Sequence, residues 1–440
     1  MKQLKQLLKF SVFAFLLISP ALYSGAFNIY EQGSHAMGLA SAFTARANDP
    51  SAIFHNPAGI AFLHGWQFYT GGTFIAPSSK FTGVAPFPGF GVEEETKDQV
   101  FFPPNAYLTF QANHRVSVGL GFFAPFGLVT EWKNPDTFSG RFLSQKAELK
   151  SFYLSSEIAV RLTDNFALAG GVQFVYSTVE LKNALNQPFN GTVLDVARTT
   201  LDGDNNIAIG FDVSAIFKPS DFLQLGALYR SKVSNDYTGT ARFEQVLTGN
   251  ASLDAIVAQG LPANASGAHE IGVATKVNFP WLFAGGILVN ATKKLSVEFD
   301  LTRFGWSEFG QLPFDFAAKK KEGDINTPED AVIIEDYNDA NQYRFGLQYQ
   351  LTDHFALRGG YIFDDTPVPT KTLNVLLPDG DRNDFTLGFG YTSGPYSVDV
   401  AWLGVFGKER SSGGKNIDNF NGTYDLGAQL LGINIGYRLK

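Results

Sequence analysis

The amino-acid sequence predicts an all-β transmembrane barrel of about 14 antiparallel strands in up-and-down order, with a small N-terminal plug inside the lumen. Three observations support this prediction. Long segments alternate between apolar and polar side chains, the connections between them alternate between short and long, and the chain begins with a segment typical of an exported protein. Together these features are typical of bacterial outer-membrane barrels, in which side chains alternate and periplasmic turns are short.

Residues 1–25 are predicted to form a signal peptide, with cleavage near residues 24–26. Three lysines at positions 2, 5 and 9 form a positively charged start, and residues 10–18 form a short apolar stretch. This arrangement is typical of secretory signals. The apolar stretch is shorter than the roughly 20 residues of a transmembrane helix; an uncleaved anchor is the alternative.

Residues 27–63 lack the alternation of a membrane strand and are predicted to form a plug, or hatch, inside the lumen. They are rich in small residues and contain the turn-like sequence Asn-Pro-Ala-Gly at 56–59. A barrel of 8 strands is filled by its own side chains, whereas 16 strands leave a channel, so about 14 strands should leave a lumen. A periplasmic extension is the alternative for this segment.

Residues 64–440 are predicted to form the barrel wall. In residues 295–302, Leu, Val, Phe and Leu alternate with Ser, Glu, Asp and Thr, and residues 431–439 repeat the pattern. Successive side chains of a strand point to opposite faces, and these segments exceed the roughly 5–6 residues of typical soluble strands. The predicted strands are 66–77, 101–112, 115–130, 146–162, 166–182, 204–218, 222–244, 268–291, 294–309, 337–351, 354–370, 382–393, 395–407 and 426–440.

Short turns are predicted at one end of the barrel, at residues 113–114, 163–165, 219–221, 292–293, 352–353 and 393–394. Because the other connections are mostly long and polar, both chain ends are expected on the periplasmic side. Pro280 interrupts the eighth strand, since proline has no N–H to donate to the ladder. Trp132 and Trp306 are predicted to lie in an outer aromatic belt and Trp66 in an inner one.

The third strand loses its alternation over residues 122–129, where both faces become apolar. Pro125 cannot donate a ladder hydrogen bond, and Gly127 permits a kink or bulge. Unsatisfied backbone in lipid costs several kcal/mol per group, so an interruption in the wall indicates a possible opening, with a bulge at the outer rim as the alternative. The candidate residues of this opening are Phe123, Ala124, Pro125, Phe126 and Gly127.

The sequence resembles the FadL family of outer-membrane transporters of long-chain fatty acids and hydrocarbons, from the N-terminal region to the last strand. The residues that carry the resemblance are 26–31 (Ala-Phe-Asn-Ile-Tyr-Glu), Gly33, Ser34, Gly38, Asn56, Pro57, Ala58, 126–132, 363–369 and 377–382. The resemblance implies a 14-stranded barrel with an N-terminal hatch. It also implies that substrate binds an apolar groove, passes to a deeper pocket, and leaves sideways through a gap in the third strand when the hatch moves.

The resemblance assigns substrate-pocket residues unevenly. Phe27 corresponds to the tip of the hatch, and residues 56–58 correspond to its turn. Lys182 is the candidate for one of two basic residues that bind a carboxylate head group in this family. The second position falls near Val332 and Ile333, where no basic residue stands, and this favours a less polar substrate such as an aromatic or alkane hydrocarbon.

Composition and motifs exclude several other classes of protein. The formal charge of −8 is spread along the chain, which argues against a nucleic-acid partner, and without cysteine there is no disulfide. The six histidines show no metal-ligand spacing and no cofactor or catalytic motif is present, so we expect no metal, no cofactor and no enzymatic activity. A general diffusion porin for small polar solutes, a barrel lipase or protease, and an adhesin or phage receptor are the alternatives.

The expected location is the outer membrane of a Gram-negative bacterium, in which the chain would be an integral, multi-pass protein. The expected partners are a hydrophobic small molecule, outer-membrane lipids and lipopolysaccharide, and the barrel-assembly machinery. The protein is expected to be a monomer.

Overall fold

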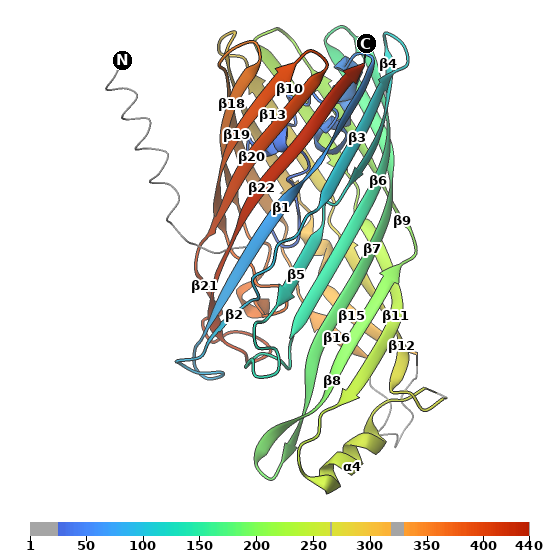
Figure 1. Ribbon diagram of the computed structural model, residues 1–440, viewed down its shortest axis with the longest axis vertical. Helices are drawn as coiled ribbons and strands as arrows, with labels where there is room; N and C mark the ends of the chain where they lie inside the picture. The colour runs from blue at the N-terminus through green and yellow to red at the C-terminus, as the bar shows by residue number, and fades with distance from the viewer. Residues whose placement is uncertain (1–24, 265, 318–329, 440) are drawn as a thin grey trace, which may run out of the picture.

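The computed structural model describes residues 25–264, 266–317 and 330–439, which form an elongated antiparallel barrel (Figure 1). The predicted signal peptide lies outside the described residues. The described residues contain no helix long and apolar enough to cross a membrane.

The wall is built from long strands and from pairs of shorter strands that continue one another across a break. The paired strands are β4 with β5, β8 with β9, β10 with β11, β12 with β13, β14 with β15, and β16 with β17. The bounds of the strands are β1 (Trp66–Gly83), β3 (Pro104–Gln111), β4 (Val116–Phe123), β5 (Gly127–Glu131), β6 (Lys146–Thr163), β7 (Phe166–Phe189), β8 (Thr192–Asn205), β9 (Ala208–Phe217), β10 (Leu223–Arg230), β11 (Val233–Gln245), β12 (Glu270–Phe279), β13 (Leu282–Val289), β14 (Leu295–Phe304), β15 (Gln311–Phe316), β16 (Ala331–Ile334), β17 (Ala340–Gln350), β18 (Phe355–Asp364), β19 (Arg382–Ser393), β20 (Tyr396–Gly407) and β22 (Gly422–Leu439). Two short outer strands, β2 (Glu93–Glu95) and β21 (Arg410–Ser411), add to the edges of β1 and β22.

The first and last strands close the barrel. β1 pairs with β22 over its whole length, from Trp66 opposite Leu439 to Gly83 opposite Gly422. Counting each continued pair as one strand, the wall has 14 antiparallel strands in sequence order, which confirms the predicted fold class. The short turns lie at the end of the barrel that holds the C-terminus (Figure 1).

Several predicted strand boundaries are wrong; for example, β1 continues to Gly83, and β15 and β16 form within the stretch 310–336, which was predicted to be a loop. β7 continues to Phe189 and pairs with β8, so the stretch 183–203, which was also predicted to be a loop, forms a hairpin. From Ala197 onward β8 also pairs with β11, and only the tip of the hairpin projects beyond the wall (Figure 1). The predicted strand 354–370 ends at Asp364, because Pro367 and Pro369 cannot donate ladder hydrogen bonds.

The predicted outer tryptophan belt is also wrong. Trp132 and Trp306 are both only 1% exposed and belong to the interior, whereas Trp66 is 45% exposed and stacks on Phe110 with ring centroids 4.2 Å apart. Trp132 directly follows β5, and Trp306 begins the short η2 helix (Trp306–Glu308) where the wall is interrupted. Strand alternation therefore no longer determines which way their side chains point.

Residues 27–63, the segment predicted to form a hatch, lie inside the barrel and are mostly buried (Figure 1), and we keep the name hatch for this segment. It includes the short helices α2 (Ser34–Met37), α3 (Ala52–His55) and η1 (Pro57–Phe62). Inward-facing glycines make room for it: a Cβ at Gly226 would lie 2.0 Å from the Thr44 carbonyl oxygen, and one at Gly121 would lie 2.6 Å from Ile53. The other helices, α4 (Ala251–Gly260) and η3 (Thr370–Thr372), belong to outer loops.

The outer face of the wall, which points away from the lumen, is apolar. In β4, Val118, Leu120 and Phe122 are exposed on the outside, while Ser117 is buried inside. This alternation leaves an apolar band that faces lipid and a polar interior that binds the hatch.

Candidate functional site

The wall is interrupted between β4 and β5, where the sequence predicted an opening. Residues 124–126 leave the ladder, and the hatch supplies replacement hydrogen bonds. The Ile29 N–H donates to the Pro125 carbonyl (2.7 Å), and the Gly127 N–H donates to the Phe27 carbonyl (2.9 Å). The side chain of Gln32 donates to the Ala124 carbonyl (2.8 Å). Backbone groups that a neighbouring strand would normally satisfy are thus satisfied by the hatch.

One edge of the interrupted strand lacks a regular neighbour. β5 pairs with β6 along its length, but no strand of the described residues runs along its other edge. There β3 begins only at Pro104, and residues 97–103 pass by in irregular conformation. The gap in the wall therefore lies between β5 and the segment 97–103.

A cavity of about 420 Å³, which we call the side cavity, occupies this gap. Its lining includes Ala124, Phe126 and Gly127 from the interruption, Phe27 and Ile29 from the hatch, and Phe102 from the irregular segment. Phe102 is 49% exposed on the outside of the barrel. The cavity thus extends from the hatch to the outer surface of the wall.

A second cavity of about 70 Å³, the outer cavity, lies further toward the outer loops. Its lining is almost wholly apolar and includes Leu128, Val179, Leu181, Leu201, Leu376 and Leu377. Glu148 and Asp202 also border it. The Glu148 carboxylate pairs with Lys146 and Lys150, which share its strand face, while the alternate residues are buried. That carboxylate therefore points away from the lumen.

The two cavities share three lining residues, of which Phe27 belongs to the hatch and Leu128 and Leu149 belong to the wall. The Phe27 ring, 3% exposed, packs edge-on against Phe126, Phe279, Trp306 and Phe309, with centroid distances of 6.0, 6.0, 4.8 and 5.3 Å. Phe126 also stacks on Phe279 at 4.6 Å. The tip of the hatch is therefore an aromatic partition between the cavities.

The outer cavity is covered by the loop 365–381, which supplies Leu376 and Leu377. The hydrogen bonds that hold this loop include those from Trp132 Nε1 to the Val375 carbonyl (3.3 Å), from Asn416 Nδ2 to the Leu373 carbonyl (2.7 Å), and from Thr372 Oγ1 to the Glu335 carbonyl (2.7 Å).

Glu335 lies under this cover with its side chain fully buried. Burial raises the pKa of its carboxyl group to about 8, because only the Asn374 amide offsets the loss of hydration, while Asp418 adds further repulsion. A carboxyl group that is mostly neutral at pH 7 therefore lies beneath the loop 365–381.

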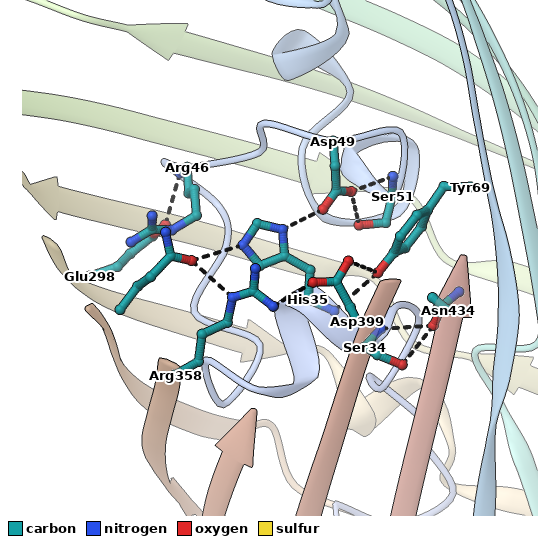
Figure 2. A network of polar contacts seen from close by, with 11 residues as sticks. Ser34, His35, Arg46, Asp49, Ser51, Tyr69, Glu298, Arg358, Asp399 and Asn434 are labelled. Carbon is teal, nitrogen blue, oxygen red and sulfur yellow. Dashed lines mark hydrogen bonds and ion pairs between the residues drawn. The ribbon is translucent and has the colours of Figure 1, made fainter. Parts of the chain in front are cut away.

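Wall side chains fix the body of the hatch by charge and hydrogen bonds (Figure 2). In β14, Glu298 accepts from the N–H groups of Ala45 (2.7 Å) and Arg46 (3.0 Å). On the adjacent strand β17, Gln348 lies 3.2 Å from Nε2 of His35, whose Nδ1 lies 2.7 Å from Asp49 of the same N-terminal segment.

The predicted hatch turn forms a second anchor. Asn56 accepts from the Ala58 N–H (3.2 Å) and donates to the carbonyls of Thr44 (2.7 Å) and Ala215 (3.0 Å). The Ala58 N–H also donates to Ser214 of β9 (3.0 Å). Asn56, Pro57 and Ala58 thus join the hatch to the wall and are not among the residues that line the described cavities.

Lys182 does not line either apolar cavity. On β7 the side chains of Val179 and Leu181 line the outer cavity, so those of Glu180 and Lys182 point the other way. The Lys182 ammonium pairs with Glu180 at 2.9 Å and its side chain is 43% exposed. Near the expected second base, Ile333 packs against the core and Val332 is exposed.

The sequence did not single out Phe279, Phe309, Leu376 and Leu377 as site residues, and it placed Trp306 in a membrane belt. They lie far apart in the chain, and no spacing marks them as partners of Phe27. One signal was available, because Pro280 interrupts the eighth strand directly after Phe279.

The interior offers no evident metal site, since the described part of the chain contains no group of three or more His, Asp or Glu residues arranged to hold an ion. The fold and the apolar outer band define an integral outer-membrane β-barrel protein.

Comparisons with known proteins identify its family. The family model described as "Outer membrane protein transport protein (OMPP1/FadL/TodX)" matches residues 15–439. The chain belongs to this family and is therefore an outer-membrane transport protein. It is 25% identical over 418 residues to a long-chain fatty acid transport protein of Escherichia coli K12, covering 88% of this chain and 89% of the relative.

It is also 25% identical over 455 residues to a putative outer membrane protein of Neisseria meningitidis, with 96% of each chain covered. Among solved structures, a Pseudomonas aeruginosa FadL homologue matches with a TM-score of 0.79 at 22% identity, covering 94% of this chain and 99% of the other. The Ralstonia pickettii toluene transporter TbuX matches at 0.69 and 17% identity, with 94% and 100% covered. These structural matches support the same fold.

Proposed function

We propose that the protein takes up hydrophobic compounds passively and releases them sideways through the interrupted wall. The observation that carries this proposal is the pair of apolar cavities that meet at Phe27, one beneath the outer loops and the other reaching the gap beside β5. The names of relatives, a long-chain fatty acid transport protein and a toluene transporter, support the same substrate class.

A sideways route is physically favoured over the full length of the lumen. Each methylene group that leaves an apolar site for water costs about 0.8 kcal/mol, so about ten methylenes would cost roughly 8 kcal/mol. The lumen beyond the cavities is occupied by the hatch and lined by buried charged groups such as Glu298, Asp300 and Arg344. An exit from the side cavity into lipid avoids that cost.

Movement of the hatch tip is the proposed gate. To connect the two cavities, Phe27 must leave its aromatic neighbours, and the hydrogen bonds from Ile29 to Pro125 and from Gly127 to Phe27 must break. The freed backbone groups at residues 124–127 would then border an open gap. The hatch anchors at Asn56 and Glu298 are separate from this tip, so the tip could move while the body stays in place.

The outer cavity is suited to the apolar part of a substrate. Its lining contains no basic side chain among the described residues, and Lys182 points to the other face of its strand. We therefore propose that this cavity binds neutral hydrocarbons or acyl chains without a carboxylate clamp. In the membrane the barrel acts as a monomer among outer-membrane lipids and lipopolysaccharide, after insertion by the barrel-assembly machinery.

A variant that seals the wall tests this proposal. Pro125→Val restores a backbone donor to the third strand, and a Val side chain at Gly127 would begin 2.9 Å from the Ile29 side chain. Uptake of labelled palmitate and hexadecane should fall at least tenfold in the double variant, while heat-modifiable mobility shows an intact barrel.

Gly170→Val is the matched control, because a Cβ at this position meets its nearest atom at 3.4 Å within an uninterrupted strand. This control should keep its uptake. Unchanged uptake in the double variant would contradict lateral exit. Swelling of protein-containing liposomes in small sugars would instead indicate a general porin.

A further inference from the structure

A third, small cavity lies beside residues 28–30 of the hatch and differs in character from the other two. This core cavity is lined by hatch residues Asn28, Tyr30, Thr44 and His55, by Arg230 and Thr302 from the wall, and by the wall residue Arg344. The volume of this cavity is about 30 Å³, which is enough for roughly two water-sized oxygen atoms. No Asp or Glu belongs to its lining.

Three polar atoms around this cavity have no hydrogen-bond partner. They are the Nε of Arg230, the Nε2 of His55 and the Oγ1 of Thr302. All three side chains are nine-tenths or more buried, with residue exposures of 5, 5 and 2%. Buried polar groups are nearly always hydrogen-bonded, so three orphan atoms around one cavity indicate a missing polar occupant.

The charge of the lining indicates the sign of this occupant. Arg344 is 6% exposed and donates to the Gln342 side chain and the Ser41 carbonyl, but no carboxylate of the described residues lies within ion-pair distance of it. Its cross-strand partner Asp300 accepts instead from the hatch N–H groups of Phe43 and Thr44. Asp300 and Asp364 act on the Arg344 charge without direct contact, and a buried guanidinium that lacks a contacting counter-ion is unfavourable.

The other two basic groups agree with this reading. Arg230 forms an ion pair with Asp212 at 3.4 Å and also donates a hydrogen bond to the Phe54 carbonyl at 2.9 Å. Burial and the nearby Arg344 lower the pKa of His55 to about 3. The imidazole is therefore neutral at physiological pH, and its N–H group can donate a hydrogen bond into the cavity.

The rest of the lining is apolar and consists of Phe54, Leu228, Leu282, Ala284 and Phe304. An inorganic anion would leave these side chains without a complement, whereas a carboxylate joins two anionic oxygens to carbon. We infer that the core cavity is a binding site for a carboxylate group, held by Arg344 and Arg230 and by the His55 and Thr302 side chains.

The carboxylate could belong to a free short-chain acid or to the head of a long-chain acid. Asn28 borders both this cavity and the side cavity, so the hatch backbone around Asn28 lies between them. The binding site rests on its own contacts; only its use by a substrate head group rests on the proposed function. In that case the head group would enter when the hatch tip moves.

The test uses trifluoroacetate as the probe, with fluorine NMR of the full-length purified protein in detergent. The neutral analogue trifluoroacetamide is the matched control ligand. We expect saturable binding of trifluoroacetate alone, and at least tenfold weaker binding by Arg344→Gln. Arg358→Gln is the matched control variant, because Arg358 is a buried lumen arginine that pairs with Asp399 at 2.6 Å and does not line this cavity.

A second variant guards against misfolding. Thr302→Val removes an orphan hydroxyl at nearly constant volume and should weaken trifluoroacetate binding several-fold in a barrel that still shows heat-modifiable mobility. Absence of saturable binding, equal binding of the amide, or unchanged binding in both cavity variants would show that water alone fills the cavity, and would overturn the inference.

Competition then distinguishes the two sources of the carboxylate. Displacement of trifluoroacetate by oleate but not by methyl oleate supports a head-group site, whereas displacement by acetate but not by oleate supports a site for free short-chain acids. Uptake of hexadecane is independent of both results, so failure of the site and failure of the proposed transport remain distinguishable.

Discussion

A disulfide between the hatch and the interrupted strand should lock the proposed gate. The chain has no cysteine, so Asn28→Cys with Phe126→Cys introduces the only two thiols. Residues 28 and 126 are antiparallel bridge partners. The hydrogen bonds on either side make them a non-hydrogen-bonded pair, for which Cα atoms lie about 4.5 Å apart, within the roughly 4.4–6.8 Å range that a disulfide spans.

The magnitude follows from the contacts that such a bond would make permanent. Four hydrogen bonds join the hatch to the interruption: Ile29 to Pro125, Gly127 to Phe27, and two between Gln32 and Ala124. At about 0.5–1.5 kcal/mol each, they favour the closed state by roughly 2–6 kcal/mol. Opening is then rare but accessible, and a covalent bond removes it. Uptake by the oxidised variant should fall by at least about tenfold. A tenfold change in rate corresponds to about 1.4 kcal/mol, which is less than the energy of these contacts.

Uptake of labelled palmitate and hexadecane is measured in cells that lack their own transporter, before and after treatment with dithiothreitol. The reduced form of the same variant controls for loss of the Phe126 ring. Thr392→Cys with Ser397→Cys, a pair between β19 and β20, controls for disulfide formation elsewhere in the wall. Equal uptake by the oxidised and reduced forms of the hatch variant would refute the reasoning, because hatch displacement would then be unnecessary.

Three further predictions concern the partition, the loop cover and the hatch turn. Phe27→Ala should weaken packing by about 3–5 kcal/mol and speed hexadecane uptake, unlike Phe62→Ala at the far end of the hatch. The pKa of Glu335 is raised from 4.5 to about 8 by burial, so the loop cover should be fully stable below pH 4.5 and lose up to about 5 kcal/mol as pH rises through 8. Limited proteolysis of this loop at pH 6 and 9 measures the change, and Glu335→Gln should abolish it. Asn56→Ala should cost about 1–3 kcal/mol and speed hydrogen exchange in the hatch without changing barrel mobility; unaltered exchange would contradict the anchoring role.

The barrel itself was largely determined by the sequence. Alternation such as that of residues 295–302 sets which face meets lipid, and short turns fix the order of the strands, so local pattern was sufficient for the 14-stranded wall. The break at Pro125 could also be predicted from the sequence, because the missing N–H of proline is a local property. Prediction failed where the local pattern is weak: the tip of the hairpin β7–β8 projects beyond the wall (Figure 1), and Trp132 and Trp306 follow breaks in the ladder.

The candidate site was decided by tertiary structure. Phe27 was singled out by the sequence, but its neighbours come from the end of β12 (Phe279) and from the η2 turn (Trp306 and Phe309), which only barrel closure brings around the hatch. The same holds for Arg230, Arg344 and His55, which meet at one cavity although the chain separates them widely. Lys182 shows the opposite case. It was predicted to bind a carboxylate, but its side chain lies on the face of β7 that points away from the cavity. The sequence by itself determines which residues alternate and where a ladder must break. Which side chains share a cavity depends on long-range packing between elements, and no local sequence pattern indicates that packing.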